Sequence, residues 1–362
     1  MQAKNLCFYL SDHGFGHIAR NIPLIAEAVH RTNGFVYVVC GKRHLEFAKA
    51  NLLELLTPEQ SSRIRYRAEH TDIGLILQQG TLLVDTAALT DACAQYLAEL
   101  PERAKQETDW LLQHDVAAAL CDMPLWSISA CEQAGVPLLY VGNFTWTELY
   151  REFLPEQIWE AYAAEYRKIR HGMLYALHNP EMLEFLSQAE LSEASLVARP
   201  FHPDEIRAIR ARHTCPVVFV ALGMSAQFTQ PVSVEGVNAH FYVTEGIPLT
   251  GSNVTVIPYS TLYTQDYVAA ADYVITKAGW GTVAECLLAQ KPMALFARDS
   301  VLEDRTTIRK LEQKKLGIKV TYEQLTEMSD LLEQMKQITY PAVPEYHNAA
   351  AEIVSKLLTL TE

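Results

Sequence analysis

The sequence lacks any uninterrupted apolar stretch near the roughly 20 residues that a membrane-spanning helix needs. It also lacks a basic leader with a cleavage site before its first strand-like run, so no signal peptide is expected. The seven cysteines are scattered and form no C-x-x-C pair, which argues against a zinc site or a disulfide framework. These absences predict a soluble, cytoplasmic protein with at most peripheral membrane contact.

Basic residues are scarce as well. Thirty Lys and Arg stand against 43 Asp and Glu, so the formal net charge is −13. Without a basic stripe to neutralise phosphates, the chain is not expected to bind nucleic acid. Apolar residues make up 49% of the 362 positions, which excludes a largely disordered chain and suffices for about two domains.

Short apolar runs alternate with longer amphipathic stretches, a pattern that predicts an α/β protein with mostly parallel sheets. A long helical region is expected over about residues 145–188, followed by a proline-rich connector at 199–203. The expected ligand site is a cleft between two domains, at the carboxyl ends of the strands. The expected strands are residues 5–10, 35–40, 116–121 and 137–141, then 216–222, 240–243, 254–257, 273–276 and 293–296.

The loop after the first expected strand carries the first candidate site. It holds two glycines but no third glycine at Ala19, so it is not a dinucleotide fingerprint, and no Gly-Lys-Ser/Thr follows to make a phosphate-binding P-loop. His17 stands at the start of a helix, where the helix dipole disfavours imidazolium and a neutral base is plausible. The alternative is that His13 or His17 caps the helix or packs against it.

Asp122 is the second candidate, at the end of an expected strand. From there a carboxylate can accept a hydrogen bond from one nitrogen of His17 and leave the other nitrogen basic. The alternative is that Asp122 is the N-cap of the helix that begins near Leu125.

The third candidate is the stretch 272–285, which predicts a strand, a glycine-containing turn and a helix. Lys277 and backbone N–H groups at 281–283 that have no helical acceptor are expected to form a positively charged site suited to a diphosphate. Glu285 either closes a capping box with Thr282 or binds a ribose diol. Downstream, Glu303 and Asp304 are expected in a strand-end loop, either binding sugar hydroxyls or simply solvated.

Three segments together, residues 13–20, 142–146 and 263–285, resemble those of GT-B nucleotide-sugar glycosyltransferases. The resemblance is in particular to the glycosyltransferase-like half of plant L-arabinokinase and its stand-alone bacterial relatives. It implies two Rossmann-like, doubly wound domains: an acceptor-side domain at 1–199 and a donor domain at 200–340. A helix at 341–362 would return to the first domain. No sugar-kinase phosphate loop is present, so kinase activity is not implied.

The resemblance also implies an inverting, metal-independent transfer from a nucleoside-diphosphate sugar, expected to be a UDP-sugar, to a small-molecule or glycan acceptor, without a cofactor. His17 would be the base and Asp122 its orienting carboxylate. Glu303 and Asp304 would bind the sugar; no glutamine follows them, so a glucose preference does not carry over. The donor-binding positions implied are Gly16, Arg199, Gly223, Met224, Ser225, Lys277, Gly279, Trp280, Gly281, Thr282, Val283 and Glu285.

Two other functions stay open at this point. A sugar-nucleotide epimerase of the same fold would need further carboxylates around the hexose, and a non-catalytic nucleotide-sugar binding or regulatory protein would bind without turnover. The aromatic residues after Asn143 belong either to the core or to an acceptor groove. They are Trp146, Tyr150, Phe153, Trp159, Tyr162 and Tyr166.

Overall fold

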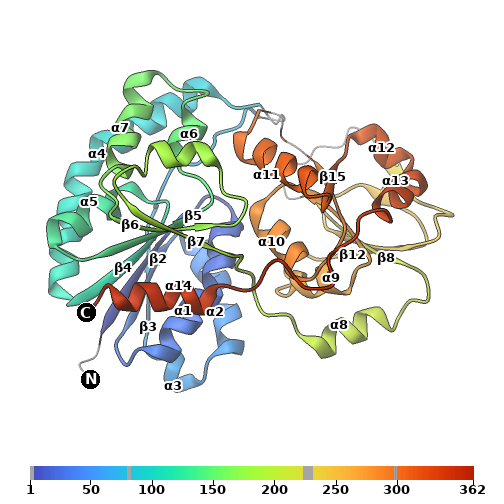
Figure 1. Cartoon of the computed structure of the whole chain (residues 1–362), viewed down its shortest axis with the longest axis horizontal. Coiled ribbons are helices and arrows are strands. Elements are labelled where there is room, and N and C mark those ends of the chain that lie inside the picture. The colour runs from blue at the N-terminus through green and yellow to red at the C-terminus, as the bar shows by residue number, and fades with distance from the viewer. Residues whose placement is uncertain (1–3, 80–82, 223–230, 297, 299) are drawn as a thin grey trace. The chain divides into compact units, whose positions relative to one another are not determined.

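The computed structural model describes residues 4–79, 83–222, 231–296, 298 and 300–362, and the chain divides into two compact units (Figure 1). The first unit comprises Met1–Leu77, Val84–Val197 and Asn348–Glu362, and the second comprises Gln78–Leu83 and Ala198–His347. The predicted α/β class, with two parallel, doubly wound sheets, is confirmed. No helix among the described residues is long and apolar enough to cross a bilayer.

The first unit is built on a seven-stranded, all-parallel sheet. Its inner strands are apolar on both faces because helices cover both: α4, α5 and α7 pack on one side, and α1, α2 and α14 on the other (Figure 1). In order across the sheet, the strands are β3 (Ile64–Ala68), β2 (Val36–Cys40), β1 (Asn5–Leu10), β4 (Val116–Asp122), β5 (Leu138–Gly142), β6 (His171–Tyr175) and β7 (Glu190–Ala194).

The helices of this unit include the last one in the chain, α14, which lies along α1. Arg31 of α1 donates hydrogen bonds to Ser355 Oγ (2.6 Å) and to the Ala351 carbonyl (3.1 Å) of α14. The helices are α1 (Phe15–Arg31), α2 (Lys42–Leu55), α3 (Pro58–Ser61), α4 (Thr86–Gln113), α5 (Leu125–Ala134), α6 (Trp146–Tyr150), α7 (Glu156–Tyr166), the 3₁₀ helix η1 (Pro180–Glu184) and α14 (Ala350–Thr359).

The second unit contains a six-stranded parallel sheet and a small two-stranded one, β11–β9. One face of the larger sheet packs through Val220, Phe241 and Ile275 into a core that α12 and α13 complete. Across the sheet the strands are β12 (Val254–Ile257), β10 (His240–Thr244), β8 (Val217–Ala221), β13 (Tyr273–Lys277), β14 (Met293–Phe296) and β15 (Gly317–Lys319). The other elements are β9 (Val232–Ser233), β11 (Leu249–Thr250), α8 (Pro203–Arg210), α9 (Thr264–Ala270), α10 (Trp280–Leu288), α11 (Leu302–Gln313), α12 (Tyr322–Thr326) and α13 (Met328–Met335).

The expectation of one long helical region over residues 145–188 is wrong. The segment is divided among α6, α7, β6 and η1, because Pro155 and Pro180 stand at helix starts and cannot continue a preceding helix. β6 lies between β5 and β7 in the sheet. Short helices and a strand therefore occupy the segment that was expected to be one helical region.

Candidate active site

A glycine turn places the candidate base. Gly14 is the N-cap of α1 with φ +75°, a conformation that favours glycine, and an added Cβ at Gly14 or Gly16 would meet no atom within 4 Å. The helix begins at Phe15, so His17 lies in its first turn, where its side chain is 9% exposed. The turn thus leaves open space beside Gly14 and Gly16, at the start of the helix that carries His17.

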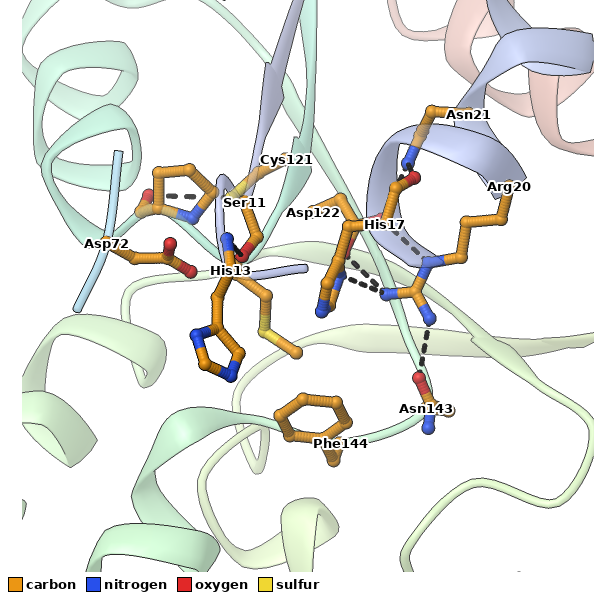
Figure 2. Close-up of polar contacts among 12 residues, drawn as sticks. Ser11, His13, His17, Arg20, Asn21, Asp72, Cys121, Asp122, Asn143 and Phe144 are labelled. Carbon is orange, nitrogen blue, oxygen red and sulfur yellow. Dashed lines mark hydrogen bonds and ion pairs between the residues drawn. The ribbon is translucent and has the colours of Figure 1, made fainter. Parts of the chain in front are cut away.

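His17 meets Asp122 across adjacent strands. Asp122 is the last residue of β4, which pairs with β1, the strand that precedes the glycine turn. His17 Nδ1 lies 2.9 Å from Asp122 Oδ1, although the two residues are 105 positions apart (Figure 2). Arg20 Nη2 lies 3.0 Å from the same nitrogen, but it donates to Asp122 Oδ1 at the shorter distance of 2.5 Å. Because an ionised carboxylate only accepts, we assign the proton to Nδ1, which leaves the lone pair on Nε2.

Two further side chains of α1 hold the same carboxylate. Arg20 donates to both oxygens, from Nε to Oδ2 at 2.8 Å and from Nη2 to Oδ1 at 2.5 Å, and Asn21 Nδ2 donates to Oδ2 at 2.6 Å (Figure 2). Arg20 also donates to Asn143 Oδ1 at 2.6 Å. The Arg20 charge and these hydrogen bonds outweigh burial and hold the pKa of Asp122 well below its usual range.

Asp122 is therefore not a helix cap. The helix that follows, α5, has Pro124 as its N-cap and no side-chain cap bond. Sequence reasoning missed Arg20 and Asn21, although a signal was present: they stand three and four positions after His17, on one face of a helix that is otherwise apolar and buried. A buried arginine on such a face indicates a buried acidic partner.

The ring of Phe144 lies 6.0 Å from that of His17, centroid to centroid. Beyond it, Trp146 Nε1 donates to Asp72 Oδ2 at 2.8 Å, and burial together with the Asp12 carboxylate raises the pKa of Asp72 to about 7. Trp146 and Tyr150 stack at 5.4 Å, and Tyr162 packs edge-on against Tyr150. These aromatic residues are core residues, as is Tyr166, whereas Phe153 and Trp159 are partly exposed.

The second unit carries the candidate donor site at the carboxyl end of β13. Lys277 ends the strand, Gly279 is the N-cap of α10, and Trp280 is buried. No described residue accepts a hydrogen bond from the N–H groups of Gly281 or Thr282, which leaves them for an anion. Val283 was expected to add a third open N–H, and this is wrong: its N–H donates to the Gly279 carbonyl at 3.2 Å, as the first hydrogen bond within the helix.

Lys277 supplies the positive charge of this candidate donor site. Burial, and to a smaller extent the neighbouring Arg298, lowers the pKa of Lys277. Its ammonium group makes no ion pair or hydrogen bond with any residue that the structure describes. Gly223, Met224 and Ser225, the other predicted phosphate contacts, lie outside the described residues.

Glu285 does not form the capping box with Thr282, since the N-cap of α10 is Gly279 and no side chain caps it. Its Oε1 instead accepts a hydrogen bond from Arg199 Nη2 at 3.2 Å. Burial raises the pKa of Glu285, and the Arg199 charge opposes that shift. The structure thus brings together two residues predicted to bind the donor separately.

Glu303 and Asp304 do not lie in a loop; they form the first turn of α11. Asp304 is fully buried and accepts hydrogen bonds from Arg298 Nη2 at 2.7 Å and Nε at 2.9 Å, whereas Glu303 is partly exposed. Arg298 was not predicted, because its ion pair forms only when the turn before α11 brings it back onto the helix. Among the described residues, no group of three or more His, Cys, Asp or Glu side chains is arranged to hold a metal ion.

Comparison with known sequences finds two similar proteins or domains. Residues 207–360 match the family model described as the glycosyltransferase family 28 C-terminal domain. L-arabinokinase of Arabidopsis thaliana is 23% identical over 337 residues, which are 88% of this chain and 31% of that protein, so the chain spans about a third of this relative's length.

Solved structures show the same fold at low sequence identity. Arabidopsis thaliana UGT89C1 complexed with UDP-L-rhamnose superposes with a TM-score of 0.67 at 12% identity, over 100% of both chains. A UDP-glucose:anthocyanidin 3-O-glucosyltransferase in complex with UDP gives a TM-score of 0.64 at 12% identity, over 99% of both chains. The chain therefore has the GT-B fold of these structures, and most of its second unit matches the C-terminal domain of a glycosyltransferase family.

Proposed function

We propose that this protein transfers a sugar from a UDP-sugar to an acceptor hydroxyl, with inversion at the anomeric carbon and without a metal ion. The observation that carries the proposal is the His17–Asp122 pair at the carboxyl end of the first sheet of a GT-B fold. A histidine whose Nδ1 proton is donated to a carboxylate offers a basic Nε2, which is the group that deprotonating a hydroxyl requires.

In the proposed reaction, His17 Nε2 takes the proton of the acceptor hydroxyl. The acceptor oxygen forms its bond to the anomeric carbon as the bond between that carbon and the diphosphate oxygen breaks, and UDP leaves with the electron pair. A single displacement of this kind inverts the anomeric centre. General-base assistance contributes about 10²- to 10⁴-fold in rate. Asp122 stabilises the imidazolium that forms, and Arg20 and Asn21 keep Asp122 ionised and in place.

The proposed donor-binding groups belong to the second unit. Lys277 and the N–H groups of Gly281 and Thr282 would neutralise the diphosphate as negative charge grows on the leaving group, at about a few kcal/mol for a well-placed donor. These groups supply from the chain itself the positive charge that a metal would otherwise supply. Glu285 would accept hydrogen bonds from the ribose hydroxyls, and Glu303 is the more accessible of the two predicted sugar-binding carboxylates.

UDP is the proposed nucleotide because two of the structurally similar proteins are named in complexes with UDP or UDP-L-rhamnose. The first unit, which contains His17, would serve the acceptor, and the second would serve the donor.

Two measurements on the purified chain test the proposal. Calorimetry with UDP, GDP and ADP should show binding strongest for UDP, and UDP-sugars with a panel of hydroxyl acceptors should release UDP with a glycoside of inverted anomeric configuration. An epimer formed from a UDP-sugar without acceptor would instead establish an epimerase. UDP binding with no turnover on any acceptor would favour a binding or regulatory role, and a product of retained configuration would refute direct displacement.

A further inference from the structure

Arg199 was expected to face the phosphates, and in the structure its guanidinium contacts three acceptors of the second unit. Nη1 donates to the Leu262 carbonyl at 2.6 Å, and Nη2 donates to Thr264 Oγ1 at 3.1 Å and to Glu285 Oε1 at 3.2 Å. The side chain is 6% exposed. A planar guanidinium held by three acceptors in different directions has little freedom to turn toward another ligand.

The backbone around Arg199 is held just as firmly. Gln265 Nε2 donates to the Pro200 carbonyl at 3.1 Å, and Asp266 accepts from the His202 backbone N–H at 2.9 Å and pairs with His202 Nδ1 at 2.8 Å. The connector 199–202 is thus fastened to the first turn of α9, within the second unit. Any movement of Arg199 would have to break several of these contacts.

We propose that Arg199 is a positioning residue, which acts through Glu285 by keeping that carboxylate ionised and oriented to accept hydrogen bonds from the ribose hydroxyls. This inference rests on the proposed function, because it requires a nucleotide at Glu285. Arg199 engages Oε1, whereas no described residue donates to Oε2. That second oxygen is the one left for the ligand.

The charges around Glu285 show why a cation is needed there. Glu285 is 7% exposed, and burial raises its pKa. Asp266 of α9, which pairs with the His202 ring, raises it further. The neighbouring Cys286 thiol stays neutral because burial raises its pKa well above the usual value. Arg199 is the cation that counters these effects. Without it, the carboxyl group would take up a proton at a higher pH and lose acceptor capacity.

The test compares the dissociation constant of UDP for Arg199→Met with that for the wild type, at several pH values between about 6 and about 8.5. The ratio of the variant's dissociation constant to that of the wild type is taken at each pH, because the titration of the UDP phosphates affects both proteins equally and cancels. We expect the ratio to be about 10 or more at the acidic end and to fall as pH rises and Glu285 ionises. Arg199→Lys, which keeps the charge, should give a smaller ratio that varies little with pH.

A matched control is Arg210→Met, which removes another arginine–carboxylate pair from the same unit. Arg210 pairs with Asp272 at 2.9 Å, immediately before β13 and so at the opposite end of that strand from Lys277. Its UDP affinity should equal that of the wild type. Should Arg199→Met fail to fold, Arg199→Lys and Glu285→Gln carry the test: in the Glu285→Gln background, Arg199→Lys should have no further effect on UDP affinity.

A ratio below about 2 for a folded Arg199→Met variant, or a larger ratio that is the same at every pH, would overturn the positioning role. An unaltered effect of Arg199→Lys in the Glu285→Gln background would do so too. These results differ from failure of the proposed function, in which the wild-type protein itself would not bind UDP.

Discussion

The sharpest test of the proposed chemistry is His17→Ala. The substitution removes one hydrogen bond from Asp122 and leaves the three that Arg20 and Asn21 donate to the same carboxylate. Asp122 therefore stays satisfied, and the expected loss in the free energy of unfolding is about 1.5 to 3 kcal/mol, the range for one hydrogen bond to a charged group. The variant should fold.

The effect on turnover should be larger. Loss of a general base costs about 10²- to 10⁴-fold in kcat, which corresponds to about 3 to 5 kcal/mol in the activation barrier at 1.36 kcal/mol per factor of ten. The dissociation constant of UDP should stay the same, because the proposed donor-binding groups are carried by the second unit. The assay is initial-rate release of UDP, with calorimetry on the same preparations.

His13→Ala is the matched control, because His13 stands in the same glycine turn. Its ring packs against Trp146 at 5.5 Å, centroid to centroid, whereas the Asp122 carboxylate contacts His17, Arg20 and Asn21. Its kcat should stay within about two-fold of the wild type. Wild-type turnover in His17→Ala would remove His17 from the mechanism, and an equal loss in both variants would indicate that the turn, not the base, had been disturbed.

Three further predictions follow from buried groups. Lys277→Met should weaken UDP binding about 10-fold or more, whereas Lys291→Met, another half-buried lysine before β14, should leave it unchanged in the same titration. Burial raises the pKa of Glu148 from 4.5 to about 8, so the folded protein binds one more proton than the unfolded chain between these pH values. The free energy of unfolding should therefore fall as pH rises from about 4.5 to about 8. Urea unfolding of Glu148→Gln should show a weaker dependence of this free energy on pH. Gly74 has φ +68°, and an added Cβ would lie 2.0 Å from His13 Nδ1. Gly74→Ala should therefore lower the free energy of unfolding by more than about 1 kcal/mol. An unchanged midpoint of urea unfolding would contradict this.

The central strands were predictable because their residues are buried on both faces. β1 and β14 have the predicted bounds, since continuous apolar runs occur where helices cover both sides of a parallel sheet. β12 also has the predicted bounds, although it is an edge strand of the second sheet and exposes Val256. β3 and β7 were missed for the opposite reason: they lie at the two edges of the first sheet, expose charged side chains such as Arg65 and Glu193, and do not form apolar runs.

The sequence by itself determined where the reactive residues stand along the chain: His17 after a glycine turn, Asp122 at the end of a strand, and Lys277 just before helix α10. Only the tertiary structure decided which of them are neighbours. Parallel pairing of β1 with β4 brings Asp122 to the first turn of α1, and the fold pairs Arg199 with Glu285, 86 positions later. Local sequence sets helix and strand starts through backbone geometry, whereas ion pairs between distant residues depend on strand order and on helix packing, which no local pattern encodes.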